Sequence, residues 1–317
     1  MNDPHQNAGD YSPSEPFDRV VPLASGGRRL DQALAELLPQ YSRSRLQAWI
    51  RDALVTLDGV PVTEAKRKLA GGERLCLRLP ETLPGEEIPE DIPLHVVFED
   101  ESILVINKPA GLVVHPGSGN WQGTLLNALL HHVPGSAALP RAGIVHRLDK
   151  DTSGLMVVAK TLEAQTDLVR QLQARTVKRQ YLALAAGKIE RSGSVDAPIG
   201  RHPVQRVKMA VVPESRGGKA ALTHYRPLIL FPACTWLECT LETGRTHQIR
   251  VHLAHIGHPL VGDPVYGKRD PRLPAFPRQA LHATRLALIH PLTAQYMQWE
   301  APPPDDLRDL LAELGYG

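Results

Sequence analysis

The stretch RAGIVHRLDKDTSGLMVVAK, residues 141–160, sets a short charged loop directly before an apolar run. The apolar residues 155–159 predict a buried strand. In the loop, Asp149 lies between Arg147 and Lys150, and neighbouring cations keep a carboxylate ionised, as nucleophilic or electrostatic catalysis at neutral pH requires. A structural knot of salt bridges would use the same residues. This stretch alone leaves both interpretations of Asp149 open.

The chain from Leu94 onward alternates between strand-like and helix-like runs. The strand-like runs are 94–100, 102–107, 155–160, 181–187 and 234–242, and the helix-like runs are 123–132 and 164–174. Because the two kinds of run alternate irregularly, we expect an α+β domain with a large, mostly antiparallel sheet.

A smaller unit precedes this domain. Residues 30–39 and 42–54 carry apolar side chains at helical spacing. Short strands follow around Asp58-Gly59, a dipeptide that favours a hairpin turn. These patterns predict a small α/β unit of two helices and a sheet. The expected division is a disordered leader at 1–17, the small unit at 18–80, a linker rich in proline and acidic residues at 81–93, and the large domain at 94–317.

Composition narrows the class of protein. The chain has 317 residues, 42% of them hydrophobic and 22% charged, which is typical of globular proteins. No run approaches the roughly 20 apolar residues of a membrane span, and the polar start does not resemble a secretory signal. Cys76, Cys234 and Cys239 form no CxxC pair, and the last two lie in an apolar run, so we expect buried free thiols and a cytoplasmic location.

The charge pattern bears on nucleic-acid binding only locally. The net charge is +2 and aromatic residues make up 5% of the chain, so neither suggests an extended nucleic-acid surface. The small unit, however, concentrates arginines at positions 29, 43, 45 and 51. Arg43 and Arg51 lie about two helical turns apart, so one helix face could follow a phosphate backbone. A solvated helix face is the alternative interpretation.

Two further segments carry candidate chemistry. Tyr181 stands at the head of a predicted strand, where it is either a packing residue or a group that stacks on an extruded base and exchanges a proton. The segment 241–267 contains Arg245 and Arg250, whose guanidinium groups suit two-pronged binding of carboxylate or phosphate.

The same segment also invites a metal-site interpretation. It contains four histidines, His247, His252, His255 and His258. Yet there is no HExxH arrangement, no cysteine is near, and Asp263 is the only close carboxylate downstream. We therefore expect no metal site. A metal-dependent hydrolase built on these histidines would be distinguished by sensitivity to chelators.

Four motifs occur together in one order. They are HRLDKDTSGL (146–155), the strand that begins at Tyr181, GRTHQIRVH (244–252) and LHATRLALIHP (281–291). With them, residues 94–302 resemble the RluA-type family of RNA pseudouridine synthases. The pattern at 29–62, with Arg29-Leu30-Asp31, Ser42-Arg43-Ser44 and Val60 after Asp58-Gly59, resembles the small RNA-binding domain named after ribosomal protein S-four. The segments YSRSR (41–45) and VVHPGSGN (113–120) further resemble members that act on large-subunit ribosomal RNA.

The resemblance implies a fold, a reaction and a partner. The fold would be that of pseudouridine synthases, and the reaction would isomerise a uridine within RNA after the base leaves its stack. No cofactor, metal or small-molecule donor is implied, because the reaction is redox-neutral. The implied partner is large-subunit ribosomal RNA or a pre-ribosomal particle, without a membrane. The rival interpretation is a catalytically silent RNA-binding factor of ribosome assembly with the same fold.

The resemblance also implies a role for each candidate residue. Asp149 would be the essential carboxylate, Tyr181 would stack on the uracil and assist proton removal, and Arg250 would pair with Asp149. The RNA-binding residues would be Arg147, which would fill the space left by the base or hold a neighbouring phosphate, and Arg245, Arg29, Arg43, Arg45 and Arg51. Leu281 or Leu286 would form an apolar wall of the base pocket.

Overall fold

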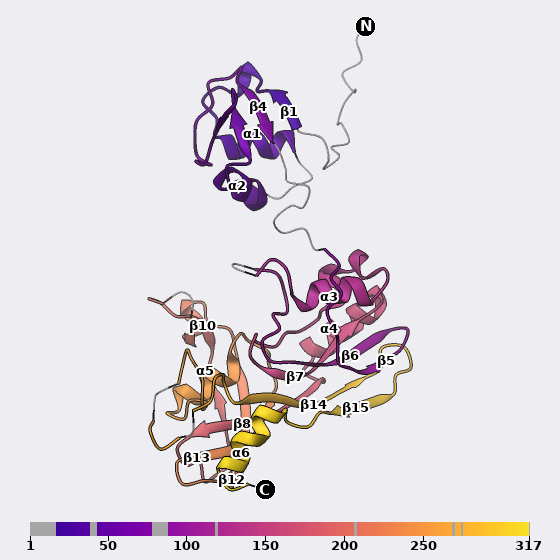
Figure 1. The fold of residues 1–317 in the computed structure, drawn as a ribbon, viewed down its shortest axis with the longest axis vertical. Coiled ribbons are helices and arrows are strands. Elements are labelled where there is room, and N and C mark those ends of the chain that lie inside the picture. Colours follow the sequence, from indigo (N-terminus) through magenta and orange to yellow (C-terminus); the bar gives the residue numbers. More distant parts are fainter. Residues whose placement is uncertain are drawn as a thin grey trace. The chain divides into compact units, whose positions relative to one another are not determined.

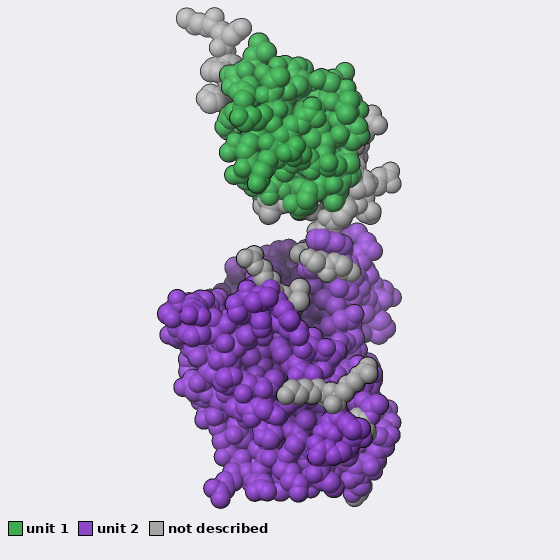
Figure 2. Space-filling model, turned by 90° about the vertical axis from the view of Figure 1, so that its left-hand side faces the viewer, with its two compact units in different colours: residues 1–86 green, residues 87–317 purple. Residues whose placement is uncertain are grey.

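The computed structural model describes residues 17–38, 43–77, 88–117, 120–205, 208–267, 270–273 and 275–316, except for the side chains of Ser44 and Arg45. The chain divides into two compact units, residues 1–86 and 87–317, coloured green and purple in Figure 2. Each unit has its own hydrophobic core.

The first unit packs two helices on a small antiparallel sheet. Its elements are β1 (Phe17–Val20), α1 (Leu30–Leu37), α2 (Arg43–Arg51), β2 (Val55–Leu57), β3 (Val60–Pro61) and β4 (Arg74–Leu77), with strand order β1-β4-β2-β3. The helices contribute Leu34 and Ile50 to a core shared with Leu75. Asp58 and Gly59 both have positive φ, 50° and 79°, which suits the tight hairpin that the sequence predicts.

The second unit is built on a nine-stranded sheet. Its strands are β5 (Val96–Glu99), β6 (Ile103–Lys108), β7 (Ser153–Ala159), β8 (Lys178–Ala186), β9 (Gly193–Asp196), β12 (Leu222–Leu230), β13 (Cys234–Leu241), β14 (Leu281–Ile289) and β15 (Tyr296–Glu300). The order is β5-β6-β7-β14-β8-β13-β12-β9, with β15 beside β14. Only β7 and β14 pair in parallel, so the α+β fold with a mostly antiparallel sheet is confirmed.

Strand β14 is the seam of this sheet (Figure 1). It lies between β7 and β8, and it pairs parallel with the first and antiparallel with the second. At the parallel contact Ala283 is opposite Gly154, whose φ is +119°. A Cβ at Gly154 would lie 2.3 Å from the Ala283 carbonyl oxygen, so the two strands can approach this closely only because residue 154 is a glycine.

Helices cover both faces of the sheet. They are α3 (Leu125–His132), α4 (Leu162–Gln173), α5 (Gln248–His255) and α6 (Asp305–Glu313). Because side chains alternate along a strand, Met156 of β7 packs with α3 and α5, whereas Val157 packs with α4. Smaller elements are the strands β10 (Ile199–Arg201) and β11 (Met209–Val211) and short 3₁₀ turns at Leu23–Ser25, Ser136–Ala138, Pro140–Gly143 and Glu214–Arg216.

The segment expected as a linker, 81–93, lies partly outside the described residues. Its last part is held to the start of α3: Glu90 accepts from the Gly123 N–H at 2.9 Å, and the Ile88 carbonyl accepts from the Asn127 amide at 2.8 Å. Residues 88–93 therefore extend the second unit on its N-terminal side.

Two expectations about the class of protein can be compared with the fold. None of the helices in the described ranges has the length and apolar character needed to cross a bilayer. Cys234 and Cys239 are buried free thiols in β13, as the sequence predicts, and Cys76 is a partly buried free thiol in β4.

Candidate active site

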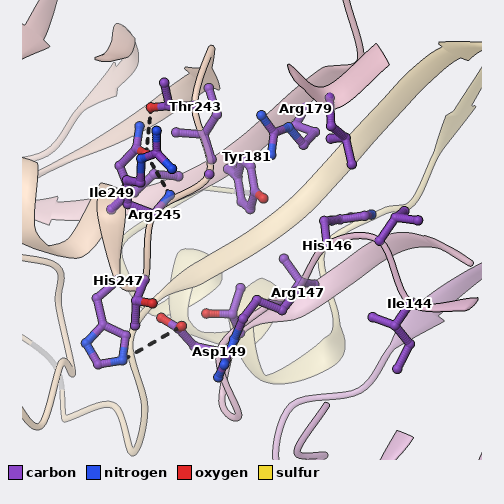
Figure 3. Close-up of a pocket in the computed structure, with 18 of the residues that line it drawn as sticks. Ile144, His146, Arg147, Asp149, Arg179, Tyr181, Thr243, Arg245, His247 and Ile249 are labelled. Carbon is purple, nitrogen blue, oxygen red and sulfur yellow. Dashed lines mark hydrogen bonds and ion pairs between the residues drawn. The ribbon is translucent and has the colours of Figure 1, made fainter. Parts of the chain in front are cut away.

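A cavity of about 870 Å³ opens in the second unit (Figure 3). Its walls come from the loop before β7, from β8, from the loop between β13 and α5, and from β14. Six of the residues singled out in the sequence line it: Arg147, Asp149, Tyr181, Arg245, Arg250 and Leu281. The fold thus gathers residues from all four sequence motifs around one space.

An arginine between two carboxylates dominates the cavity. The Arg250 Nη1 donates to Asp149 Oδ2 at 3.0 Å, while its Nε and Nη2 donate to the two oxygens of Asp263 at 2.7 and 3.0 Å. The Arg250 side chain is 5% exposed, that of Asp263 is fully buried, and that of Asp149 is 15% exposed. The carboxylate that faces the cavity is therefore Asp149.

Electrostatics keep Arg250 and Asp263 charged. Burial alone would lower the pKa of Arg250, but its bonds to Asp263 and Asp149 outweigh burial and raise that pKa. Burial alone would raise the pKa of Asp263, but Arg250 and the N–H groups of Tyr266 and Val265 lower it. Because Asp263 accepts from two of the three guanidinium nitrogens, Arg250 is fixed in place and donates from the third, Nη1, to Asp149.

His247 faces the other oxygen of Asp149. Its Nε2 lies 3.8 Å from Asp149 Oδ1, and its Nδ1 is hydrogen-bonded to the Tyr266 hydroxyl at 2.9 Å. The Tyr266 ring also lies beneath the Arg250 guanidinium, 5.2 Å from its ring centroid. The Met209 N–H donates to the same Tyr266 oxygen, so Tyr266 connects His247 to the backbone of β11.

Hydrogen bonds from Lys108 and Arg278 hold the backbone of the loop that carries Asp149. The fully buried Lys108 donates to the carbonyl oxygens of Lys150, Pro109 and Leu112 at 2.7 to 2.9 Å. Burial lowers the pKa of Lys108 to about 7. Arg278 donates to the Asp151 carbonyl at 3.0 Å. These bonds fix the loop through its backbone and leave the Asp149 side chain directed into the cavity.

The helix that carries Arg250 is oriented by Gln248. The Gln248 Oε1 accepts from the Thr243 hydroxyl at 2.8 Å and from the Arg245 N–H at 3.0 Å, and its Nε2 donates to the Leu222 carbonyl at 3.0 Å. His247, at the start of α5, has the left-handed φ of 57°. The motif GRTHQIR therefore shapes a strained turn that ends in a fixed arginine.

Tyr181 and Leu281 form the apolar part of the wall. Both are buried, at 6% and 4% exposure, and both belong to the core cluster on the α3 and α5 face of the sheet. Burial raises the pKa of the Tyr181 phenol. Leu286, the other candidate for this wall, does not line the cavity: it lies five residues beyond Leu281 and packs with Val157 on the opposite face.

The rim of the cavity is basic. Arg147 and Arg245 are exposed, and Arg245 donates through Nε to the Ala220 carbonyl at 3.0 Å. Arg141 and Arg175 line the same cavity. A negatively charged chain approaching the opening would therefore meet arginines on several sides.

Three of the four histidines of segment 241–267, His247, His252 and His258, have separate hydrogen-bond partners. His252 is hydrogen-bonded to the Thr223 hydroxyl and the Ala197 carbonyl, both at 2.9 Å, and His258 to the Ala186 carbonyl at 2.9 Å. Within the described parts of the chain, no group of three or more His, Cys, Asp or Glu residues is placed to hold a metal ion.

The candidate RNA-binding arginines of the first unit converge in part on Asp31. This carboxylate is fully buried and accepts from Arg29 at 2.9 and 3.0 Å, from Arg43 at 2.9 Å and from Gln47 at 2.6 Å. Arg29 and Arg43 remain 34% and 48% exposed, so the Asp31 bonds hold both guanidinium groups near the surface. Arg51 is exposed, and the side chain of Arg45 lies outside the described residues.

Sequence reasoning missed Asp263, Tyr266 and Lys108. Asp263 had been noted only as a poor metal ligand, although it lies on the same quoted segment as Arg250. A buried arginine needs its charge balanced, and a nearby acidic residue is the signal that could have identified the partner. Lys108 gave no such signal, because its acceptors are backbone carbonyls.

Comparison with known proteins finds a family match in each unit. Residues 102–255 match the family model of RNA pseudouridylate synthases, and residues 28–75 match that of the S4 domain. The structure resembles human RNA pseudouridylate synthase domain containing 1, with a TM-score of 0.54 and 28% identity over 68% of this chain and 85% of that one.

Relatives over nearly the full length are more similar still. The ribosomal large subunit pseudouridine synthase D of Nitrosomonas europaea is 57% identical over 314 residues, covering 97% of this chain and 90% of that protein. The protein of the same name from Pseudomonas aeruginosa is 57% identical over 306 residues, covering 93% and 94%. With this identity over almost all of its length, the chain belongs to the family of RNA pseudouridine synthases.

Proposed function

We propose that this protein converts uridines of large-subunit ribosomal RNA to pseudouridine, with Asp149 as the catalytic carboxylate. The contact between Asp149 and Arg250, 3.0 Å long and set in a cavity with a basic rim, is the observation that carries the proposal. The choice of RNA follows the names of the relatives in Nitrosomonas europaea and Pseudomonas aeruginosa.

Asp149 is suited to attack because its carboxylate is held by Arg250 and lines the cavity. Arg250 binds only one of its oxygens, and the other faces the cavity near His247. The carboxylate would attack the ribose or the uracil ring as the bond between ribose and the uracil nitrogen breaks. The uracil would then turn and join the ribose through its carbon-5, and the bond to Asp149 would break. The carbon-5 proton would leave and the freed nitrogen would take up a proton, so the composition of the uridine is unchanged and no donor molecule takes part.

Tyr181 and Arg147 would stabilise the RNA after the uracil has left its stack. A uridine in a helix must leave its stack before Asp149 can reach it, and stacking on an aromatic ring offsets part of that cost. Tyr181 offers such a ring in the same part of the cavity wall as the apolar Leu281, and burial keeps its phenol protonated. Arg147, exposed beside Asp149, would fill the vacated space or hold the neighbouring phosphate.

The first unit would hold the RNA without taking part in the chemistry. Its S4 domain at 28–75 carries the exposed guanidinium groups of Arg29, Arg43 and Arg51. We further propose that the substrate is ribosomal RNA as such or within a pre-ribosomal particle, and that the protein works in the cytoplasm. The free thiols of Cys76, Cys234 and Cys239 suit a reducing compartment.

A catalytically silent assembly factor would need the fold but not the arrangement of Asp149, Arg250 and Asp263. Arg250 and Asp263 are buried, and burying charges is costly unless they serve a purpose, so their presence beside Asp149 favours the enzyme.

The deciding experiment is chemical mapping of pseudouridines in large-subunit ribosomal RNA from cells with and without this protein. We expect specific pseudouridines to vanish in the deletion strain and to return with the wild-type gene but not with Asp149→Asn. A complete set of large-subunit pseudouridines in the deletion strain, with losses in transfer RNA instead, would contradict the proposed target. Recovery of the sites by Asp149→Asn would contradict the proposed catalyst.

A further inference from the structure

Arg179 lies beside the reactive residues but has none of their partners. It stands on β8 two residues before Tyr181, so the two side chains share one face of the strand (Figure 3). Both line the cavity. Arg179 is 7% exposed, about as buried as Arg250 at 4%.

The two buried arginines differ in how their charge is met. Arg250 is bound to the carboxylates of Asp149 and Asp263. Arg179 forms no ion pair with any residue that the structure describes. Among those residues its side chain has one hydrogen bond, from Nη2 to the Glu242 backbone carbonyl, at the long distance of 3.5 Å. Its Nε is buried without a hydrogen-bond partner within the described ranges. A buried cation is costly unless an anion offsets it.

The main chain holds this guanidinium against the cavity wall. A Cβ placed on Gly244 would lie 2.7 Å from Arg179 Nη1, so the loop after β13 passes directly over it. Arg179 cannot swing outward past this loop without moving it. Arg245, the next residue of the loop, is exposed and bonds to the Ala220 carbonyl, so it does not occupy the same place.

The substrate supplies the missing anion. RNA carries one negative charge on each phosphodiester, and the fork of a guanidinium matches phosphate oxygens. At about 870 Å³, the cavity is near the upper end of the usual range for ligand sites, which leaves room for a nucleotide with its phosphate rather than a base alone. We propose that Arg179 binds a phosphodiester oxygen adjoining the target uridine. This rests on RNA being the substrate, as proposed above.

Such a contact acts on binding rather than on the chemical step. The phosphate carries its charge before, during and after the reaction, so Arg179 stabilises the bound substrate and the transition state alike. Loss of the contact should therefore weaken the affinity for RNA and leave the rate at saturating RNA unchanged. Arg179 is in this sense a substrate-binding residue, distinct from Arg250, which acts on Asp149.

The test uses full-length protein and short RNAs. Each RNA contains a uridine that the mapping experiment shows to be unconverted in the deletion strain. In each RNA one phosphodiester near that uridine is replaced by a neutral methylphosphonate. We expect one linkage at which the replacement weakens binding to wild type by about ten- to hundredfold, the range for a hydrogen bond to a charged group. Arg179→Gln should weaken binding to unmodified RNA by a similar factor. Replacing that one linkage should not lower the affinity of the variant further, whereas replacements at the other linkages should affect the variant as they affect wild type. Arg191→Gln, an exposed arginine outside the cavity, is the matched control and should behave as wild type.

The outcomes separate the alternatives. Equal sensitivity of wild type and Arg179→Gln at every linkage would overturn the proposal. Normal affinity with a slower single-turnover rate would also overturn it and would point to a contact with the base. If Arg179→Gln does not fold, Arg179→Lys is tested instead, because lysine keeps the charge but lacks the guanidinium fork. In this variant the methylphosphonate should cost less affinity than in wild type at that linkage only. The same loss of affinity as wild type at every linkage would count against the proposal. Absence of pseudouridine in the wild-type reactions would contradict the proposed target and leave the binding comparison valid.

Discussion

The Arg250 guanidinium donates to two carboxylates that have different roles. Asp149 faces the cavity, whereas Asp263 is fully buried and accepts two further bonds from the N–H groups of Val265 and Tyr266. Because Asp263 is fixed by the backbone, it fixes Arg250 in turn. The direction of the Asp149 carboxylate therefore depends on a residue that never reaches the substrate.

Asp149→Asn should abolish pseudouridine formation while the protein folds and binds RNA as wild type does. The amide keeps the shape but has neither the charge nor the nucleophilicity of the carboxylate. Tritium release from uracil-labelled RNA, measured beside an RNA-binding assay, checks this. Asp151→Asn, two residues away and outside the cavity wall, is the control and should keep its activity. Loss of folding together with binding in Asp149→Asn would instead favour the structural salt-bridge interpretation.

Asp263→Asn should lower kcat by about 100-fold and change the RNA affinity little. Arg250 loses a charged anchor and can shift, and a misplacement of about 1 Å near reacting atoms costs on that order. Asp263→Glu, which keeps the charge, should recover part of the rate. Single-turnover rates and RNA dissociation constants measured on the same samples distinguish this positioning role. A loss confined to RNA affinity would show that Asp263 does not act through Arg250.

Asp31→Asn should destabilise the first unit by about 2 kcal/mol, less than for a fully buried pair because Arg29 and Arg43 are partly exposed. Burial alone would raise the Asp31 pKa, but bonds from Gln47, Arg43 and Arg29 lower it below its ordinary 3.8. The ionised form thus contributes stability above about pH 4 that is lost as the pH falls through the folded value. Hydrogen exchange of α1 and α2 at several pH values checks this. A difference from wild type that grows towards low pH would contradict it.

At the scale of elements, the most clearly patterned segments were predictable and the central ones were not. The expected helices at 123–132 and 164–174 correspond to α3 and α4. Helix α5 has no apolar stripe because Gln248 and the following five residues are all buried, so its sequence shows no helical period. Strand β12 contains Pro227, which weakens a strand prediction, and its register shifts just after that residue.

The candidate site was predictable as a set of motifs but not as a set of contacts. Asp149 and Arg250 were expected to meet because the family resemblance pairs them. The pairing of Arg250 with Asp263, and of Arg29 and Arg43 with Asp31, depends on which carboxylate the fold brings within reach. Spacing along the chain does not contain that information.

Gly154→Ala should destabilise the second unit by about 3 kcal/mol, since it adds strain at a positive φ to a collision with the Ala283 backbone. Gly217→Ala is the matched control: its φ is +88° but no atom lies within 4 Å of its Cβ, so about 1 kcal/mol is expected. Denaturant unfolding of both variants measures the difference. Equal losses would show that β7 and β14 can separate at no cost.

At the scale of the whole molecule, the proposal assigns the chemistry to the second unit and additional RNA contacts to the first. Removing residues 1–86 should weaken RNA binding and reduce its salt dependence, by roughly one unit of slope for each lost phosphate contact. The rate at saturating RNA should change much less, because the cavity is formed entirely within 87–317. Binding isotherms at several salt concentrations check this. An unchanged slope in the folded, shortened protein would contradict the role given to the first unit.

The position of β14 at the seam also sets the order in which a growing chain can become an enzyme. The chain first completes β5, β6 and β7, with Asp149 just before β7, and then β8, β9, β12 and β13, followed by Arg250. These two halves share no strand pairing until β14 emerges from the ribosome and joins them. Asp149 and Arg250 are 101 residues apart, roughly 5 to 20 seconds of synthesis at about 5–20 residues per second. The first unit is complete long before, so a chain released before Leu281 would be an RNA-binding protein without an assembled active site.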